Sequence, residues 1–128
     1  MFTAVAAFSG FSVDDGQKAK EFYTNTLGLQ LADETMGLMF SLPDGGSVFI
    51  YEKDDHQAAT YTVLNFVVDD IDASVDVLTQ NGVTFERYDD MPGAQDEKGI
   101  IRGGGDNPGP SIAWFKDPAG NILALIQK

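Results

Sequence analysis

The sequence contains the same pattern twice, and this internal repeat constrains the fold more than any other feature. Val13-Asp14-Asp15 opens a helical pattern that ends at Leu27-Gly28, and Val68-Asp69-Asp70 opens a second that ends at Asn81-Gly82. The acidic motif and the closing glycine therefore recur with nearly the same spacing in both copies. A chain built this way is expected to fold as two related modules.

A later match extends the repeat and locates an insertion. The segment Leu42–Tyr51 resembles the segment Asp117–Ile126. These segments lie farther apart in the chain than the two acidic motifs do, so the second copy holds about twenty additional residues between Phe85 and Asp117. This insertion includes Met91-Pro92-Gly93 and the run Gly103–Pro110, whose glycines and prolines are typical of turns.

Each copy is predicted to contain a strand, a helix and further strands. Residues 2–13 are apolar at both parities, as expected of a strand that is covered on both faces. The acidic pairs Asp14-Asp15 and Asp69-Asp70 are suited to cap the helices, and Gly28 and Gly82 to end them in left-handed backbone. Further strands are expected near 30–34, 37–42 and 47–52, and near 84–88, 99–102, 111–115 and 122–127.

Composition limits the function classes. The chain has 128 residues, with twenty Asp and Glu against eight Lys and Arg, for a formal net charge of −12. No basic patch exists to neutralise phosphates, so we expect neither nucleic acid nor membrane as a partner. The chain contains no cysteine, which favours the cytoplasm, and its longest stretches without a charged residue, Met1–Val13 and His56–Val68, are too short to cross a bilayer.

Several motifs resemble the vicinal-oxygen-chelate superfamily, which includes glyoxalase, bleomycin-resistance protein and extradiol dioxygenases. They are Phe22–Leu29, the strand-Val-Asp-Asp-helix opening, and Trp114–Asn121. The resemblance covers essentially the whole chain. It implies an α+β fold in which two βαβββ modules form a curved mixed sheet around a concave site, usually within a homodimer. We expect one such domain, with module one at about 1–53, a linker at 54–60 and module two at about 61–128.

The metal enzymes of that superfamily carry one ligand on the first strand and one on the last strand of each module, usually His, Gln or Glu. The matching positions here are Phe8, Phe49, Val63 and Ala124. None of these side chains can bind a metal, and a shift of one residue in either direction still gives no ligand set. We therefore expect no metal and no cofactor.

The side chains at these positions predict a binding cleft for an organic molecule instead. The predicted ligand-binding residues are Phe8, Phe49, Tyr51, Val63, Asn65, Arg102, Trp114 and Ala124. Aromatic faces supply stacking, Asn65 supplies hydrogen bonds, and Arg102 supplies a cation for an acidic ligand. Phe8 and Phe49 are equally explained as core residues, and the sequence leaves open which face of its strand Trp114 takes.

Three function classes remain open. The leading hypothesis is a metal-free small-molecule-binding protein, similar in logic to the bleomycin-resistance proteins. The alternative is a lyase, isomerase or dioxygenase-like enzyme similar to lactoylglutathione lyase. Such an enzyme would carry its metal ligands at other positions than the four named, or would use Glu52, Tyr51 or Arg102 without a metal, with Glu52, Asp33 and Glu34 as candidate bases. An accessory interaction module is the third class. The single histidine, His56, is interpreted as a solvated linker residue.

Overall fold

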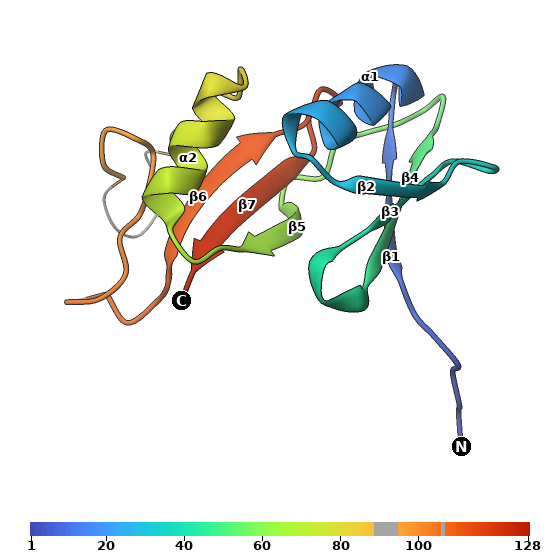
Figure 1. Cartoon of the computed structure of the whole chain (residues 1–128), viewed down its shortest axis with the longest axis horizontal. Helices are drawn as coiled ribbons and strands as arrows, with labels where there is room; N and C mark the ends of the chain where they lie inside the picture. Colours follow the sequence, from blue (N-terminus) through green and yellow to red (C-terminus); the bar gives the residue numbers. More distant parts are fainter. Residues whose placement is uncertain (89–94, 106) are drawn as a thin grey trace. The chain divides into compact units, whose positions relative to one another are not determined.

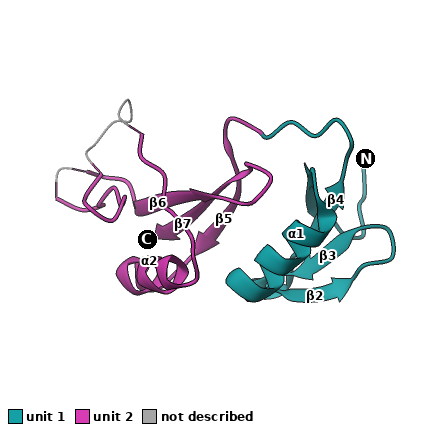
Figure 2. Ribbon diagram, turned by 90° about the horizontal axis from the view of Figure 1, so that it is seen from above, with its two compact units in different colours: residues 1–58 teal, residues 59–128 magenta. Residues whose placement is uncertain are grey.

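The computed structural model describes residues 1–88, 95–105 and 107–128. The chain divides into two compact units, Met1–Ala58 and Ala59–Lys128 (Figures 1 and 2). Each unit contains one copy of the repeat and is a sheet with a helix on one face. The Met91-Pro92-Gly93 turn lies outside the described residues.

Unit 1 is a four-stranded mixed sheet with the strand order β1-β4-β3-β2. β1 runs parallel to β4, and the other neighbours are antiparallel. Its elements are β1 (Ser9–Val13), α1 (Gly16–Glu21), the π-helical turn η1 (Phe22–Thr26), β2 (Gln30–Asp33), β3 (Leu38–Ser41), the 3-10 turn η2 (Pro43–Gly45) and β4 (Ser47–Glu52).

The ends of the first helical segment follow the predicted signals. Asp15 is the N-cap of α1, and its carboxylate accepts hydrogen bonds of 3.1 Å from the backbone N–H groups of Gln17 and Lys18. Gly28 follows the helix with φ of 75°, the left-handed conformation that glycine adopts without strain. The helix covers one sheet face, and on that face Tyr23 and Phe40 are fully buried.

Unit 2 is a three-stranded sheet with the order β5-β7-β6, in which β5 is parallel and β6 antiparallel to β7. Asp70 caps its helix by accepting a 3.1 Å hydrogen bond from the N–H of Ala73, at the position that matches Asp15 in the repeat. Its elements are β5 (Thr62–Val67), α2 (Ile71–Gln80), β6 (Ser111–Lys116) and β7 (Ile122–Gln127).

Strand pairing reproduces the alignment of the two repeat copies. Gly10 pairs with Phe49 in unit 1, and Asn65 pairs with Ala124 in unit 2. The Val-Asp-Asp motifs align Gly10 with Asn65 on the first strand, and the later match aligns Phe49 with Ala124 on the last strand. The two units are therefore matched residue for residue at their first and last strands.

Three predicted strands are shorter than expected or are not formed. Residues 1–8 lie outside β1 and are exposed, although the ring of Phe8 contacts Phe49 of unit 1. The segments 84–88 and 99–102 are not strands. They are joined to β6 through the isolated bridges Phe85–Phe115 and Ile101–Ile112 and do not form continuous strand pairs with it, because the turn-rich insertion leads the chain away after each bridge.

The Asp117–Asn121 motif forms the turn between β6 and β7. The buried carboxylate of Asp117 accepts hydrogen bonds from the N–H of Ala119 (3.0 Å) and from the N–H and side-chain amide of Asn121 (2.8 and 2.9 Å). Asn121 is also buried, at 2% exposure. This motif is a satisfied polar network that shapes the hairpin.

Candidate functional site

Each sheet has a second face that its own helix does not cover, here called the helix-free face. Side chains alternate along a strand, so Phe49, which lies between the buried Val48 and Ile50 of β4, belongs to this face in unit 1. In unit 1 it is formed by Gly10, Ser12, Met39, Phe49 and Tyr51.

Aromatic rings gather on the helix-free face of unit 1. The rings of Phe49 and Tyr51 are stacked, with centroids 5.7 Å apart and planes 22° apart. Phe8 meets Phe49 edge-on at 6.5 Å and 79°. Gly37 allows this arrangement, because a Cβ at that position would lie 2.8 Å from the Cζ atom of Phe49. The result is a cluster of three aromatic rings, whose faces are suited to stack against an organic ring.

A polar pair lies on the same face. Ser12 Oγ lies 2.7 Å from Nδ1 of His56, and Ser12 is the register partner of Tyr51. His56 is partly buried, so the structure does not bear out the interpretation of this residue as a freely solvated linker histidine. The hydroxyl and the imidazole place polar groups beside the stacked rings.

The helix-free face of unit 2 is centred on a row of three register partners, Asn65, Ala124 and Trp114. Gln127 identifies the opposite face, because its side-chain carbonyl accepts a 2.9 Å hydrogen bond from the N–H of Ile71 in α2. The structure thus settles which face Trp114 takes. Its ring is only 8% exposed and forms a cluster with Ile101 and Ala124.

Tyr88 packs edge-on against Trp114, with ring centroids 5.5 Å apart. Its hydroxyl is buried and has no hydrogen-bond partner among the described residues, and burial raises the pKa of Tyr88. Gln95 holds the segment in place, since its carbonyl accepts from the N–H of Tyr88 (2.6 Å) and its amide donates to the carbonyls of Glu86 and Gly99. A ligand atom that accepts a hydrogen bond from this hydroxyl would remove the cost of leaving it unpaired.

The four positions where the resemblance places metal ligands do not fit a metal. Phe8 and Phe49 meet on unit 1, Ala124 lies in the Trp114 cluster, and Val63 falls at the register shift between Thr62 and Leu64. None of the four side chains offers a nitrogen, oxygen or sulfur atom. Within the described ranges, no three His, Cys, Asp or Glu side chains are grouped so that they could hold a metal ion.

Arg102 is engaged by carboxylates of its own unit. Its guanidinium binds both oxygens of Asp72 on α2 at 2.6 and 2.8 Å, and its Nε donates to Asp96 at 2.9 Å. Lys98 reaches Asp72 at 3.3 Å and Asp76 at 3.0 Å. The hydrogen bond from Arg102 holds the pKa of Asp72 well below its usual range. These ion pairs connect the insertion to α2, whereas the neighbouring Ile101 packs on Trp114.

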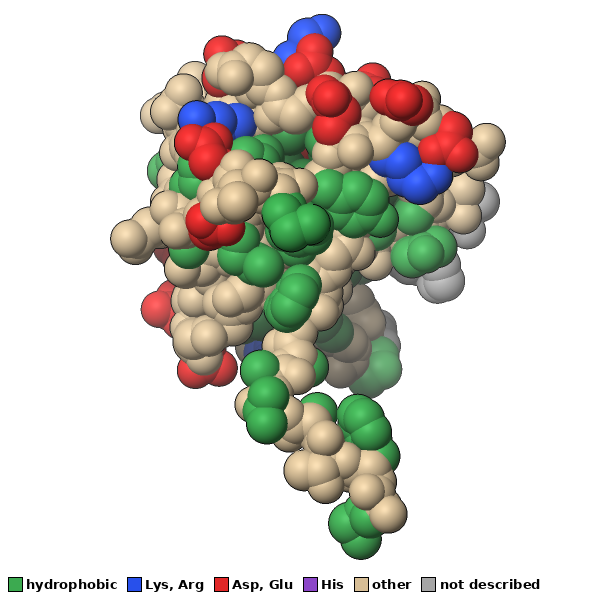
Figure 3. All heavy atoms as spheres, turned by 90° about the vertical axis from the view of Figure 1, so that its right-hand side faces the viewer, with side chains coloured by type: hydrophobic (Ala, Val, Ile, Leu, Met, Phe, Trp, Pro, Cys, Tyr) green, Lys and Arg blue, Asp and Glu red, His purple; other side chains and the backbone are tan. Residues whose placement is uncertain are grey.

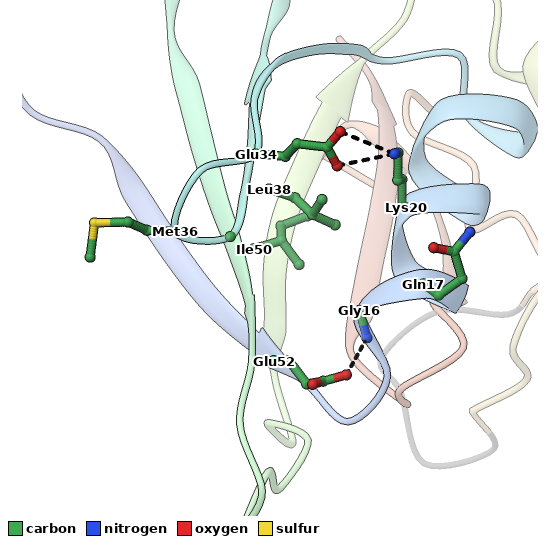
Figure 4. Close-up of a pocket in the computed structure, with 9 residues that line it drawn as sticks. Gly16, Gln17, Lys20, Glu34, Met36, Leu38, Ile50 and Glu52 are labelled. Atoms are coloured by element: carbon green, nitrogen blue, oxygen red, sulfur yellow. Dashed lines mark hydrogen bonds and ion pairs between the residues drawn. The ribbon is translucent and has the colours of Figure 1, made fainter.

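A separate cavity of about 270 Å³ lies on the helix side of unit 1, between α1, β3 and β4 (Figure 4). It contains Glu34 and Glu52, two of the carboxylates considered as bases. Lys20 forms a 3.0 Å ion pair with Glu34, and Glu52 accepts a 2.8 Å hydrogen bond from the N–H of Gly16. Glu52 and Tyr51 point to opposite faces of the sheet, so they do not share one site.

Sequence reasoning named six residues of the helix-free faces and missed others. Phe8, Phe49 and Tyr51 meet in unit 1, and Asn65, Ala124 and Trp114 form one row in unit 2. Tyr88 and Ile101 were missed because they reach the face from outside the regular strands. Met39 was missed as well, although the repeat aligns Met39 with Trp114. The two residues have matching partners in their sheets, since Met39 pairs with Phe49 in unit 1 and Trp114 pairs with Ala124 in unit 2.

The sequence model of the Glyoxalase/Bleomycin resistance protein/Dioxygenase superfamily, a protein family, matches residues 5–125 of this chain. No curated protein sequence matches the chain. The part of the chain that the structure describes holds no helix that is long and apolar enough to cross a membrane.

Solved structures resemble the chain over nearly its whole length. A member of the same superfamily from Sphaerobacter thermophilus DSM 20745 is 26% identical, with a TM-score of 0.64 and coverage of 97% of this chain and 98% of that one. TnmS3, an antibiotic-binding protein from Streptomyces sp. CB03234, is 24% identical, with a TM-score of 0.67 and 98% coverage of both chains. The fosfomycin resistance protein FosX from Listeria monocytogenes is 19% identical, with a TM-score of 0.65 and coverage of 99% and 93%.

Proposed function

Since the chain belongs to the Glyoxalase/Bleomycin resistance protein/Dioxygenase superfamily, we propose that it binds a small organic molecule on its helix-free faces without a metal ion. The observation that carries the proposal is the contact between Phe8 and Phe49. Two aromatic rings stand where the metal enzymes of the superfamily carry ligands, and the rest of the scaffold is retained. Rings at these positions support stacking in place of metal coordination.

The polar groups on these faces suggest what the ligand offers. The buried Tyr88 hydroxyl is a donor that has no acceptor among the described residues. The exposed Asn65 side chain, on the same face as Trp114, supplies both a donor and an acceptor. We expect a ligand with a ring that stacks and a carbonyl or ether oxygen that accepts from Tyr88. With a formal charge of −12, the protein favours a neutral or cationic molecule.

The neighbours direct the choice of the first compounds. TnmS3 is described as an antibiotic-binding protein and FosX as a fosfomycin resistance protein, which supports antibiotics as the first class to screen. We further propose that the protein is a homodimer. We also propose that it works in the cytoplasm, because proteins of that reducing compartment rarely contain disulfides and this chain has no cysteine to form one.

Trp114 makes the proposal testable, because it is the only tryptophan in the chain. Its intrinsic fluorescence can be titrated with bleomycin, fosfomycin and a set of aromatic antibiotics, with thermal shift as a second readout. Saturable quenching together with a rise in Tm supports binding. If no compound gives either signal in the presence of chelator, and one does so only with added metal, the metal-free proposal is wrong.

The enzymatic alternative keeps its own test. A lyase, isomerase or dioxygenase-like activity that uses Glu52 or Tyr51 would convert a hemithioacetal or a catechol, and this turnover can be assayed directly. The positions of Glu52 and Tyr51 on opposite sheet faces favour binding over such catalysis, since a base and its partner need to reach one substrate.

A further inference from the structure

Ser12 lies near the end of β1, on the helix-free face of unit 1. Alternation along the strand places it there, because Val13 is buried and the ring of Phe11 lies 6.2 Å from that of the buried Tyr23 on the helix side. Ser12 is partly exposed and is the register partner of Tyr51. A molecule bound on the helix-free face can therefore reach its hydroxyl.

The turn after β4 brings the single histidine of the chain back to β1. The N–H of Lys53 donates to the carbonyl of Val13 (3.0 Å), and the N–H of His56 donates to the carbonyl of Lys53 (3.1 Å). These backbone hydrogen bonds fix the turn to the end of β1, where Nδ1 of His56 lies 2.7 Å from Ser12 Oγ. The local fold of unit 1 thus holds a hydroxyl and an imidazole together over a separation of 44 residues.

This distance between a serine hydroxyl and an imidazole nitrogen suits nucleophilic catalysis. Serine is a weak nucleophile while it keeps its proton, and a base about 2.6–3.2 Å away is able to take that proton. When the ring proton of His56 is on Nε2, its Nδ1 accepts and the hydroxyl of Ser12 donates. Stacking of a ligand on the aromatic side chains does not use this pair.

The strand leaves room for a substrate beside the hydroxyl. Gly10 lies two residues before Ser12, on the same face; it is exposed and pairs with Phe49. A ring that stacks on Phe49 or Tyr51 meets no side chain at position 10 when it places a substituent next to Ser12. Figure 3 shows hydrophobic side chains along the N-terminal segment that leads into β1, and Phe8 at its end is 61% exposed, so the rings are accessible from this end of the strand.

We infer that Ser12 and His56 act as nucleophile and general base, and that unit 1 hydrolyses carboxylic esters of aromatic molecules that stack on this face. The inference rests on the proposed function, because the face must first bind the ring. It differs from the alternative that combines Glu52 with Tyr51, since the hydroxyl, the imidazole and the stacked rings belong to one sheet face.

The reaction takes two steps and needs only the ester and water. Ser12 Oγ forms a bond to the carbonyl carbon while its proton passes to Nδ1 of His56. The bond between that carbon and the alcohol oxygen breaks, and the alcohol leaves with the proton from His56. Water then attacks the acyl group on Ser12, again with His56 as the base, and the carboxylic acid is released as Ser12 regains its proton.

Hydrolysis of naphthyl acetate by the full chain tests the inference, with release of naphthol measured by its fluorescence. We expect Ser12→Ala and His56→Gln each to lower kcat/KM about a hundredfold or more. The double variant should be no slower than either single one, because the two residues act as a unit. Ser74→Ala is the matched control, since Ser74 is a partly buried serine of α2 whose hydroxyl donates a 2.9 Å hydrogen bond to the carbonyl of Asp70, and it should keep the full rate.

The acyl group itself identifies the nucleophile. Protein mixed with naphthyl acetate is quenched in acid, digested and analysed by mass spectrometry, and we expect an acetyl group on Ser12 of the unaltered protein and of Ser74→Ala. Acetyl groups on lysines without one on Ser12 would overturn the inference. So would equal rates of hydrolysis by Ser12→Ala and Ser74→Ala.

Ethoxynaphthalene separates this inference from the proposed function, because it has the same ring without an ester carbonyl. Calorimetric titration should show that it binds the unaltered protein and Ser12→Ala with similar affinity. If it binds both while Ser12→Ala hydrolyses the ester as fast as the unaltered protein, the binding face stands and the nucleophile–base pair is wrong. If it does not bind and the ester is not hydrolysed, the stacking face is wrong and the inference falls with it.

Discussion

The rings of Phe8 and Phe49 meet edge-on, with their centroids 6.5 Å apart. These are the two positions in unit 1 where the resemblance to metal enzymes places ligands. The contact is possible because Gly37 leaves room for the Phe49 ring. Aromatic packing therefore occupies a place where a metal site would need nitrogen or oxygen donors.

We predict that Phe49→Ala weakens ligand binding about tenfold or more, because it removes the ring that contacts both Phe8 and Tyr51. The variant should still fold, since the main core of unit 1 lies on the opposite sheet face. Calorimetric titration with the compound that gives the largest thermal shift measures the change. Met36→Ala is the control, and equal affinities for the two variants would contradict the prediction.

Tyr88→Phe should separate stability from binding. The substitution removes a buried hydroxyl that has no partner among the described residues, so the free energy of unfolding should stay the same or rise by about 1 kcal/mol. Ligand affinity should fall. Urea unfolding and quenching of Trp114 fluorescence measure the two effects. Tyr61→Phe, at an exposed position, should change neither, and a Tyr88→Phe protein that binds normally would exclude the hydroxyl as a donor to the ligand.

The ion pair between Asp72 and Arg102 should make stability depend on pH. The hydrogen bond from Arg102 lowers the pKa of Asp72 in the folded state, so the contribution of this pair is present above the ordinary aspartate pKa of about 4. It is lost as the pH falls through the lower pKa of the folded state.

Asp72→Asn should therefore be less stable than the unaltered protein at pH 7 and equal to it in strong acid. Urea unfolding across this pH range measures the difference, which added salt should reduce. Asp14→Asn is the control, since no ion pair in the described structure includes Asp14. A difference that persists unchanged in acid would show that the ion pair is not its source.

Asp117→Ala should destabilise the protein by about 3 kcal/mol or more, because three donors lose a buried carboxylate acceptor. Asp69→Ala, at an exposed position, should cost about 0.5 kcal/mol or less. Chemical unfolding of both variants tests this. A small effect at Asp117 would mean that the turn is held by its backbone alone.

The repeat made much of the fold predictable. It aligns Gly10 with Asn65 and Phe49 with Ala124, and the structure pairs Gly10 with Phe49 and Asn65 with Ala124 as register partners. The caps at Asp15 and Asp70 were also predictable, since an acidic side chain before a helix has a local role. Such signals depend on neighbouring residues and are therefore visible in one sequence.

The contacts made by the insertion could not be predicted in this way. Arg102 binds Asp72 over a separation of 30 residues, and Tyr88 reaches Trp114 from outside any strand. No periodicity or spacing relates these residues, because irregular segments have no repeating geometry. The exposure of residues 1–8 was also missed, since an apolar run looks the same whether its own sheet or another surface covers it.

Fluorescence titration of Trp114 before and after removal of metal ions tests the central proposal most directly. The protein is purified without an affinity tag, divided, and one half is treated with chelator, with its metal content measured by elemental analysis. We predict the same saturable quenching and the same affinity in both halves, with metal far below one equivalent. Binding that disappears on chelation and returns with one equivalent of zinc, nickel, manganese or iron would contradict the account.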